Sequence, residues 1–335
     1  MKVVDLFCGC GGLSLGFQNA GFHIVAAFDK WNSALNVYKK NFTHLSDELD
    51  LSDVTNSVQV ISKLCPEMII GGPPCQDFSS AGKRDEDGGR GNLTINYAQI
   101  ISAIKPKWFV MENVSQILKT NKLKEAKQIF YQSGYGLTQI VLDASYCNVP
   151  QKRKRFFLIG KLNETDGFLD SYIVSGLSKK PMTMRDYFGD SLGLEYYYRH
   201  PRSYARRGIF SIDEPSPTVR GVNRPMPQGY KIHPNDPIKS KEGVRPLTTL
   251  ERSYIQTFPK SYVFEGNKTD LEQMIGNAVP VNLAKFVGMA IQKYLKQPHQ
   301  YRNLEIDYTN TSLEKRLIYY ASEPQNLTYS KEAKD

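Results

Sequence analysis

Apolar and polar positions change period repeatedly along residues 2 to 160. Short apolar runs of strand character alternate with segments of helical period, in which apolar residues recur every three or four positions. The runs lie at 3–7, 24–28, 68–70, 108–111, 137–142 and 156–159, and the helical segments at 13–20, 34–42, 97–104 and 123–132. This alternation predicts an α/β fold, with a doubly wound, mostly parallel sheet covered by helices.

The pattern is lost after about residue 175, where prolines, glycines, arginines and tyrosines follow without a sustained period. Residues 176–262 are therefore predicted to form a smaller, irregular domain. An amphipathic helix returns near 282–295, so we expect 263–297 to complete the domain that residues 1–175 begin. The tail, 298–335, is polar, and its pattern indicates no function.

Composition narrows the class of protein. The 335 residues suffice for one large domain or two unequal ones, and a net charge of +9 favours a polyanionic partner without requiring one. The chain has five cysteines, and Met1 leads directly into a predicted strand without a secretory signal, which is typical of a reducing cytoplasm. Neither the cysteines nor the five histidines show metal-ligand spacing, and we expect no metal and no membrane helix.

One cysteine follows a predicted strand on a stiff loop. In Gly71-Gly72-Pro73-Pro74-Cys75, the glycines permit close approach of backbone or ligand, and the prolines fix φ ahead of the thiol. A single cysteine is more often a small core residue. Here the presentation favours a nucleophile at Cys75.

A glycine-rich turn and an acidic residue suggest a nucleoside site. The first predicted strand runs into Cys8-Gly9-Cys10-Gly11-Gly12, and Asp29 closes the second strand about twenty residues later. Glycines at such a turn let a ligand approach a helix N-terminus, and the acid suits ribose hydroxyls. The strict dinucleotide pattern is absent, because Ser14 occupies its last position, so a dinucleotide site and a simple tight turn both stay open.

Two further clusters flank predicted strands. Glu112 follows the apolar run 108–111 at the carboxyl edge of the sheet, where it suits either catalysis or a favourable place at a helix N-terminus. Arg153 and Arg155 alternate within a basic run at 151–155, so they should share one face. They would orient a phosphate or a base carbonyl and favour a thiolate, unless the run is a solvated basic edge.

The irregular region is rich in arginine. Between 196 and 224 it holds no lysine and six arginines, which are Arg199, Arg202, Arg206, Arg207, Arg220 and Arg224. Guanidinium groups read guanine edges and clamp phosphates, and Tyr196, Tyr197, Tyr198 and Tyr204 would stack on bases or line a groove. The alternative is a solvated charged face.

In this order the clusters resemble the cytosine carbon-5 DNA methyltransferases, in particular compact bacterial modification enzymes. The resemblance spans most of residues 2 to 295. It rests on 5–12, 72–76, 112–114, 151–155, 245–252 and the segment Gly276-Asn277-Ala278-Val279-Pro280. Each piece is weak, but the ordered set is specific.

The resemblance implies a class I methyltransferase fold, with 1–175 as the catalytic and cofactor-binding domain and 176–262 as the target-recognition domain. It implies that Cys75 attacks the cytosine, that Glu112 hydrogen-bonds its ring, and that Arg153 and Arg155 hold the base. The cofactor would be S-adenosyl-L-methionine. Its implied contacts are Phe7, Gly9, Gly11, Asp29, Lys30, Asp50, Leu51, Pro74, Asn277 and Ala278, with Lys30 departing from the large residue usual at that place.

The implied partner is double-stranded DNA, contacted by the six arginines and by Gln76 and Ser79. We expect a cytoplasmic, nucleoid-associated monomer, with a restriction endonuclease as a functional partner. Alternatives are an RNA cytosine methyltransferase of the same fold, a DNA-binding relative without turnover, and a nicotinamide oxidoreductase, which would leave Cys75 and the arginines without a role. The recognition sequence cannot be read from 176–244, since contacts depend on loop conformation.

Overall fold

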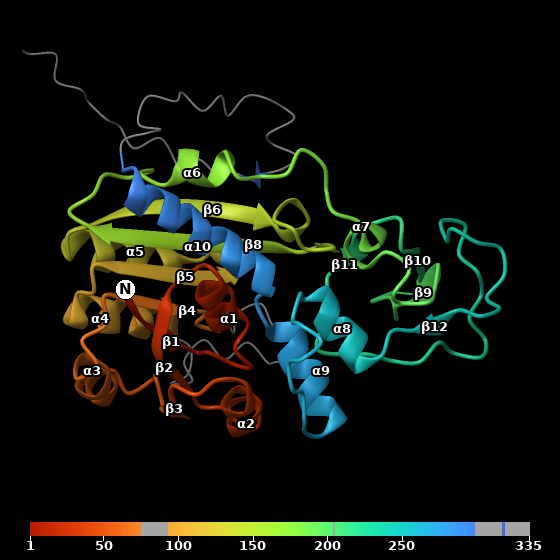
Figure 1. Ribbon diagram of the computed structural model, residues 1–335, viewed down its shortest axis with the longest axis horizontal. Coiled ribbons are helices and arrows are strands. Elements are labelled where there is room, and N and C mark those ends of the chain that lie inside the picture. The colour runs from red at the N-terminus through yellow and green to blue at the C-terminus, as the bar shows by residue number, and fades with distance from the viewer. Residues whose placement is uncertain (75–92, 204, 299–316, 319–335) are drawn as a thin grey trace, which may run out of the picture.

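The computed structural model describes residues 1–74, 93–203, 205–298 and 317–318. Its centre is an eight-stranded sheet in the order β13-β6-β8-β5-β4-β1-β2-β3 (Figure 1). The strands are β1 (Lys2–Leu6), β2 (His23–Asp29), β3 (Leu45–Glu48), β4 (Met68–Gly71), β5 (Trp108–Val114), β6 (Tyr135–Asp143), β8 (Lys154–Leu162) and β13 (Leu317–Ile318). The predicted α/β class is confirmed.

Strand β8, inside the sheet, runs against both of its neighbours. Strands β3, β2, β1, β4 and β5 pair in parallel, whereas β8 is antiparallel to both β5 and β6. Residues 144–153 alone connect β6 to β8, and they hold only the short helix η3 (Ala144–Tyr146) and strand β7 (Gln151–Lys152). A parallel return needs a crossover of a dozen residues or more, so the short connection accounts for the reversal.

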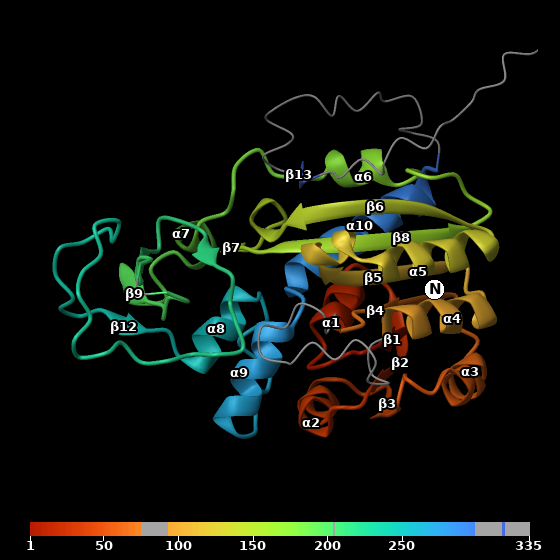
Figure 2. The same cartoon turned by 180° about the vertical axis from the view of Figure 1, so that it is seen from behind.

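Helices cover both faces of the sheet (Figures 1 and 2). One face carries α1 (Gly12–Asn19), α6 (Asp170–Val174) and α10 (Val281–Lys296), and the other carries α3 (Val54–Ser62), α4 (Leu93–Ile104) and α5 (Asn121–Gln132), with η2 (Ser115–Lys119) before α5. Because strand side chains alternate, Val3 joins the core under α1 and Val4 the core under α4. The carboxyl ends of the parallel strands thus lie along one edge of the sheet, between the two helical layers.

The chain returns to the first domain through two consecutive helices, α9 (Lys268–Asn277) and α10. Residues 268–296 are long and apolar enough to cross a membrane, a run that the sequence analysis did not anticipate. However, helix geometry breaks at 278–280, and 67% of the apolar window is buried inside the protein. Leu283, Val287 and Ile291 pack into the core with α1. The apolar character of this run is therefore explained by its packing in the protein core.

A second, irregular unit projects from the sheet beyond α8 (Thr249–Ile255) and α9 (Figure 1). It contains α7 (Met184–Phe188) and a small sheet of β10 (Ile209–Ser211), β9 (Tyr196–Tyr198) and β12 (Arg245–Pro246). Strand β11 (Ser216–Pro217) pairs instead with β7 of the first domain. Helix α2 (Asn32–Asn41) shares an apolar cluster with α9 and this unit. The boundaries at 175 and 262 stay predictions.

Two of the tyrosines expected to face a groove belong to the core of this unit. Tyr197 and Tyr198 are each 1% exposed. The ring of Tyr197 packs on Phe210, and that of Tyr198 meets Tyr230 at 5.3 Å between centroids. The strands of the unit are short, and these rings supply much of its core. Tyr204 lies outside the described residues.

Candidate active site

The carboxyl ends of three neighbouring strands bring the predicted catalytic segments together. Strand register places Gly71 between Leu6 and Met111, so the residues that follow β4 lie between those that follow β1 and Glu112 in β5. A Cβ built on Gly72 would lie 3.1 Å from Oε2 of Glu112. Glycine at this position therefore leaves room for the carboxylate at the start of the Pro73-Pro74 loop.

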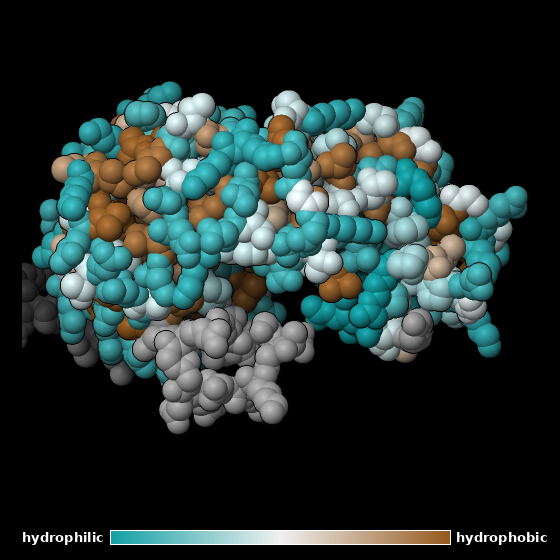
Figure 3. Space-filling view, turned by 90° about the horizontal axis from the view of Figure 1, so that it is seen from below, coloured by the Kyte–Doolittle hydropathy of each residue, from teal (hydrophilic) through white to brown (hydrophobic). Residues whose placement is uncertain are grey.

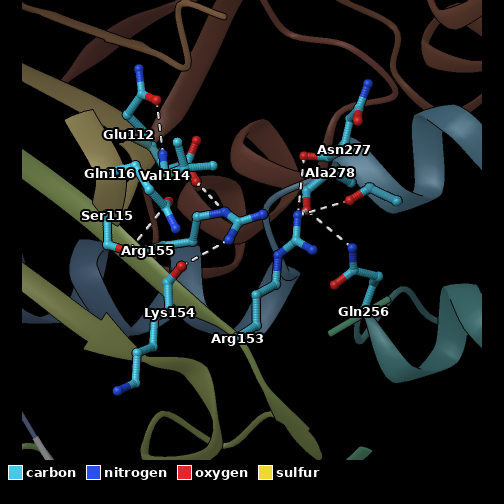
Figure 4. A network of polar contacts seen from close by, with 12 residues as sticks. Glu112, Val114, Ser115, Gln116, Arg153, Lys154, Arg155, Gln256, Asn277 and Ala278 are labelled. Carbon is cyan, nitrogen blue, oxygen red and sulfur yellow. Dashed lines mark hydrogen bonds and ion pairs between the residues drawn. The ribbon is translucent and has the colours of Figure 1, made fainter. Parts of the chain in front are cut away.

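Glu112 is a buried carboxyl, 8% exposed. Burial raises its pKa, although the charges of Arg155 and Arg153 oppose the shift. The Nε atom of Arg155 lies 2.9 Å from Oε1 of Glu112, but the angle does not make a hydrogen bond, and Oε1 has no hydrogen-bond partner among the described residues (Figure 4). Glu112 can thus be protonated at a higher pH than an ordinary glutamic acid and has bonding capacity left for a ligand.

A buried amide fixes the loop that leads to the predicted nucleophile. The Nδ2 atom of Asn113 donates to the carbonyl of Pro73 at 2.8 Å, and its Oδ1 accepts from the amide of Val114. The side chain therefore ties β5 to the chain two residues before Cys75. The sequence analysis had given Asn113 no role, although its place beside Glu112 was the available signal. Cys75 itself, with Gln76 and Ser79, lies outside the described residues.

The other cysteines make poor nucleophiles. Cys8, Cys10 and Cys147 are buried, and burial raises the pKa of each thiol, to about 12 for Cys10. Since the thiolate is the reactive form, these three are inert at neutral pH. Cys65 is exposed, but it precedes β4 and so lies at the opposite edge of the sheet. Cys75 is the cysteine that the chain places after the carboxyl end of β4.

Arg153 and Arg155 have different surroundings. Arg155 faces Glu112, and its Nη1 also donates to the carbonyl of Lys154. Arg153 is 1% exposed and points to the segments that meet behind the site (Figure 4). Its guanidinium donates to the carbonyls of Val219, Gly276, Asn277 and Ala278. A role for Arg153 at the base or the thiolate stays a prediction.

The crevice above β1 and β2 has the features of a nucleoside site. Both oxygens of Asp29 accept backbone hydrogen bonds, from the amide of Gly9 at 2.7 Å and from that of Trp31 at 2.8 Å. Phe7, which is half-buried, and Gly9 both have positive φ, and a Cβ on Gly9 would meet nothing within 4 Å. A positioned carboxylate thus lies beside open space, which fits a ribose bound at a strand end.

Gly11 is required for packing against neighbouring side chains, and does not leave open space for a ligand as Gly9 does. It has a φ of 89°, caps the N-terminus of α1, and would bring a Cβ within 2.5 Å of the Phe42 ring. The segment after α9 lies close by, because a Cβ on Gly12 would meet the carbonyl of Val279. This places Asn277, which is exposed, and Ala278 near the first crevice, and their contact with a cofactor stays a prediction.

The remaining predicted cofactor residues are Lys30, Asp50, Leu51 and Pro74. Lys30 forms an ion pair with Asp50, and this partner, more than the neighbouring hydroxyl of Ser52, lowers the pKa of Asp50 to about 2. Leu51 is buried behind them, whereas Pro74 is exposed at the start of the catalytic loop. The position directly after Asp29 is therefore occupied by the flexible side chain of Lys30, which is held by Asp50.

A buried polar chain runs behind the crevice. The hydroxyl of Ser14 donates to Asp5 at 2.6 Å, the Tyr38 hydroxyl donates to Ser14 at 2.7 Å, and Tyr38 also contacts Nε2 of His44 at 2.8 Å. Asp5 is fully buried, and burial raises its pKa to about 8. The sequence analysis missed this chain, although an acid inside an apolar strand was its signal.

The six arginines of the irregular unit divide into two groups. Arg207 pairs with Glu214 and lies 4.3 Å from the centroid of the Phe210 ring, so it helps to hold the unit together. No ion pair joins the other five to a carboxylate within the described ranges. Four of these lie close together. In addition to burial, the charges of Arg220 and Arg202 lower the pKa of Arg199, and those of Arg202 and Arg224 lower the pKa of Arg220.

This four-arginine cluster has the electrostatics of an anion site. Burial first, and then Arg220, lowers the pKa of Arg199 to about 10. A cavity of about 30 Å³ lies between Arg199, His200, Arg220 and Val222. Seen from below, hydrophilic side chains are prominent on the part of the surface that the irregular unit forms (Figure 3). Within the described part of the chain, no group of three or more metal-ligating side chains gathers.

Comparison with known proteins identifies the family. A family model for C-5 cytosine-specific DNA methylases matches residues 1–293. The Type II methyltransferase M.HindV of Haemophilus influenzae is 63% identical over 300 residues, which cover 89% of this chain and 98% of the relative. The Type II methyltransferase M.HgiDI of Herpetosiphon aurantiacus is 55% identical over 298 residues, covering 89% and 96%.

Solved structures show the same fold. The crystal structure of the S. pombe Dnmt2 methyltransferase is similar with a TM-score of 0.65 at 18% identity, covering 90% of this chain and 99% of that one. A putative DNA modification methyltransferase encoded in an E. coli prophage also gives a TM-score of 0.65, at 22% identity, covering 89% and 100%. Together with the family match, these findings confirm the resemblance drawn from the sequence motifs: the chain belongs to the C-5 cytosine-specific DNA methylase family and is a DNA cytosine-5 methyltransferase.

Proposed function

We propose that the protein transfers a methyl group from S-adenosyl-L-methionine to carbon 5 of one cytosine in a specific sequence of duplex DNA, through a transient bond to Cys75. The observation that carries the proposal is the arrangement at the strand ends. The segment Gly72-Pro73-Pro74, which precedes Cys75 in the chain, starts beside Glu112, a buried carboxyl with an unsatisfied oxygen that faces Arg155.

The first step is addition of the Cys75 thiolate to carbon 6 of the cytosine. The sulfur supplies the electron pair of the new bond, and the carbon 5–carbon 6 double bond of the ring shifts its electrons towards N3 and the carbonyl oxygen. Carbon 5 then has enamine character and can take up an electrophile. Loss of the proton from methylated carbon 5 afterwards returns electrons to the ring and expels the thiolate.

Glu112 and Arg155 stabilise the charge that this addition creates. A protonated Glu112 donates to N3, which its raised pKa favours, and Arg155 lies beside it to neutralise the developing oxyanion. Since both groups come from paired strands, β5 and β8, their geometry is set before the base arrives. Such preorganised donors account for a large share of rate enhancement in enzymes.

The residues of the first crevice fit the cofactor. Asp29 would take the ribose hydroxyls, Phe7 would stack on the adenine, and Asp50 and Leu51 would lie along the adenine edge, with Asn277 closing the site. When bound, S-adenosylmethionine supplies a methyl group activated by a sulfonium centre. The fit rests on the open space at Gly9 and on the two amides that orient Asp29.

The irregular unit reads the DNA. A stacked cytosine is inaccessible to Cys75, so the target must rotate out of the duplex, at a cost of a few kcal/mol that protein contacts offset. The four-arginine cluster provides those contacts, because its charges repel one another until phosphates neutralise them, and its guanidinium groups can also donate hydrogen bonds to guanine edges. Arg206, which is exposed, adds to this surface, while Arg207 supports it through Glu214.

The relatives suggest the biological setting. The similar proteins from Haemophilus and Herpetosiphon are both named Type II methyltransferases. By analogy the enzyme protects cytoplasmic DNA against a restriction endonuclease of the same specificity, a functional partner that need not bind it.

Bisulfite sequencing of DNA from a methylation-free host that expresses the protein tests the proposal. Conversion-resistant cytosines should appear within one short sequence, and they should be absent from cells that express Cys75→Ala. Labelled S-adenosylmethionine offered with duplex DNA or with transfer RNA in vitro then fixes the substrate. Labelling of transfer RNA alone would overturn the assignment of duplex DNA.

A further inference from the structure

Arg153 is a buried cation whose described hydrogen bonds go to backbone carbonyls. Its Nη1 donates to Val219 at 3.0 Å, and its Nη2 donates to Gly276 and Ala278 at 2.9 Å each and to Asn277 at 3.3 Å. Four acceptors around one guanidinium leave it little freedom to turn towards a substrate. These acceptors belong to chain segments 66 to 125 residues away from it.

Three of the four acceptors form the carboxyl end of α9. Gly276 and Asn277 are its last residues, and Ala278 follows as its C-cap. Carbonyls at a helix C-terminus carry partial negative charge and lack partners within the helix, so a cation there is favourable. Arg153 thus holds residues 276–278, the closing segment, from which the side chain of Asn277 is exposed at the proposed cofactor site.

The fourth acceptor begins residues 219–224, the recognition segment, which carries Arg220 and Arg224 of the four-arginine cluster. The same edge of the first domain binds its start through further contacts. The amide of Val219 donates to Oε1 of Gln151 at 2.8 Å, and the Thr218 hydroxyl donates to the carbonyl of Lys152 at 2.7 Å. Residues 151–153 therefore serve as a fixed edge for the entry to the recognition segment.

The two segments also touch each other directly. A Cβ on Gly276 would lie 2.3 Å from backbone atoms of Arg220 and Gly221, so the helix end and the recognition segment pack backbone to backbone. Gln256 of the α8 C-terminus donates to the carbonyls of Ile275 and Ala278. Arg153 lies where these three parts of the chain and the start of β8 converge (Figure 4).

We infer that Arg153 is a positioning residue that sets the recognition segment and the closing segment in one fixed relation to the catalytic sheet, and does not contact the reacting atoms. Through it, the residues that read DNA and the residue that closes over the methyl donor share one support. This inference rests on the proposed function for what the two segments bind. The geometry of the junction stands independently of it.

Arg153→Lys tests the inference, because lysine keeps the charge but cannot span both segments with a planar fork. Lys154→Gln, at the exposed neighbour, is the matched control. Hydrogen–deuterium exchange of the free enzymes is measured first. We expect amides in 216–221 and 276–279 to exchange roughly tenfold or more faster in Arg153→Lys, with β1 and β4 unchanged. Wild-type exchange in both segments would overturn the inference.

Ligand binding supplies the second readout. DNA affinity is measured with and without S-adenosylhomocysteine, for wild type, Arg153→Lys, Arg155→Lys and Lys154→Gln. If Arg153 links the two segments, the factor by which one ligand strengthens the other should fall towards one in Arg153→Lys and persist in Arg155→Lys, although both lose turnover. The same factor in Arg153→Lys as in wild type, with kcat lost, would place Arg153 at the reacting atoms.

Two controls keep the outcomes separate. Wild-type transfer to duplex DNA is measured in parallel, so its absence would refute the proposed function while the exchange data still judge the junction. If Arg153→Lys does not fold, Thr218→Val removes one bond on the recognition side only. Accelerated exchange should then extend from 216–219 into the closing segment, and exchange confined to 216–219 would contradict the inference.

Discussion

Replacement of Asp5 by asparagine probes the buried polar chain behind the cofactor crevice through the pH dependence of stability. Asp5 is 0% exposed, and only one of its oxygens has a hydrogen-bond partner among the described residues, the hydroxyl of Ser14. Burial is the main cause that raises its pKa from 3.8 to about 8, with Asp29 adding to it and Ser14 opposing. The folded protein therefore binds a proton that the unfolded chain releases across this range.

The direction of the effect follows from this difference. A carboxyl whose pKa is raised by folding favours the folded state fully below its unfolded pKa, and that contribution is lost as the pH rises through the folded pKa. The range from pH 5 to pH 7 lies between the unfolded pKa of 3.8 and the folded pKa of about 8. In this range the folded protein keeps the proton on Asp5, and the unfolded chain has released it. At about 1.4 kcal/mol per pH unit, wild type should lose about 3 kcal/mol relative to Asp5→Asn over these two units.

Asparagine is a close isostere of the protonated acid, but it places an amide donor where the second carboxyl oxygen has no partner. That unmatched donor costs about 1 to 3 kcal/mol, independent of pH. The absolute stability of the variant is therefore less informative than its slope. Glu112, whose pKa is also raised by burial, acts in both proteins and cancels in the difference.

Urea denaturation at pH 5, 6 and 7, for wild type and Asp5→Asn, measures the two slopes. The difference in unfolding free energy should move in favour of the variant by about 3 kcal/mol across the series and level off above pH 8. Parallel profiles for the two proteins would refute the reasoning, since they would mean that Asp5 is ionised in the folded state or not buried.

Three further predictions concern catalysis and binding. Glu112→Ala should lower kcat by on the order of 10² to 10³, because it removes a donor to the ring. Glu112→Gln should lower kcat less, and its rate should no longer decline at alkaline pH. Equal losses of kcat in the two variants would contradict the assignment. Arg220→Ala should reduce the slope of log DNA affinity against log salt by about one, and Arg207→Ala should leave it unchanged, as measured by fluorescence anisotropy. Gly276→Ala should weaken DNA binding at least as much as Arg220→Ala, since its Cβ overlaps the backbone of the recognition segment; wild-type affinity would argue against that packing.

The sequence predicted the parts of the fold that depend on local signals. Strands β1, β4 and β5 are short apolar runs, and glycines follow β1 and β4 closely, so the residues at the carboxyl edge of these two strands followed from the pattern alone. Strand β3 and helix α3 were not anticipated. The strand lies at the edge of the sheet with the polar sequence Leu-Ser-Asp-Glu, mostly exposed, and therefore lacks the apolar alternation of a buried strand.

Roles that depend on distant partners could not be read from the chain. Arg153 and Arg155 look equivalent in a basic run, yet one meets Glu112 and the other meets carbonyls of Val219 and of the end of α9. Likewise, nothing local separates Arg207, which pairs with Glu214, from Arg220, which belongs to the four-arginine cluster. Tertiary contacts decide these roles, and periodicity carries no information about them.

The central claim is that the sulfur of Cys75 becomes bonded to a cytosine during turnover. The most direct test offers the enzyme, with S-adenosylmethionine, a duplex containing its methylation site with 5-fluorocytosine at the target. Fluorine replaces the hydrogen at carbon 5 and cannot leave as a cation, so the thiolate is not released. The account predicts a stable protein–DNA adduct that peptide mass spectrometry assigns to Cys75, and none with Cys75→Ser. An adduct at another residue, or methyl transfer to the unmodified duplex at the wild-type rate by Cys75→Ser, would contradict it.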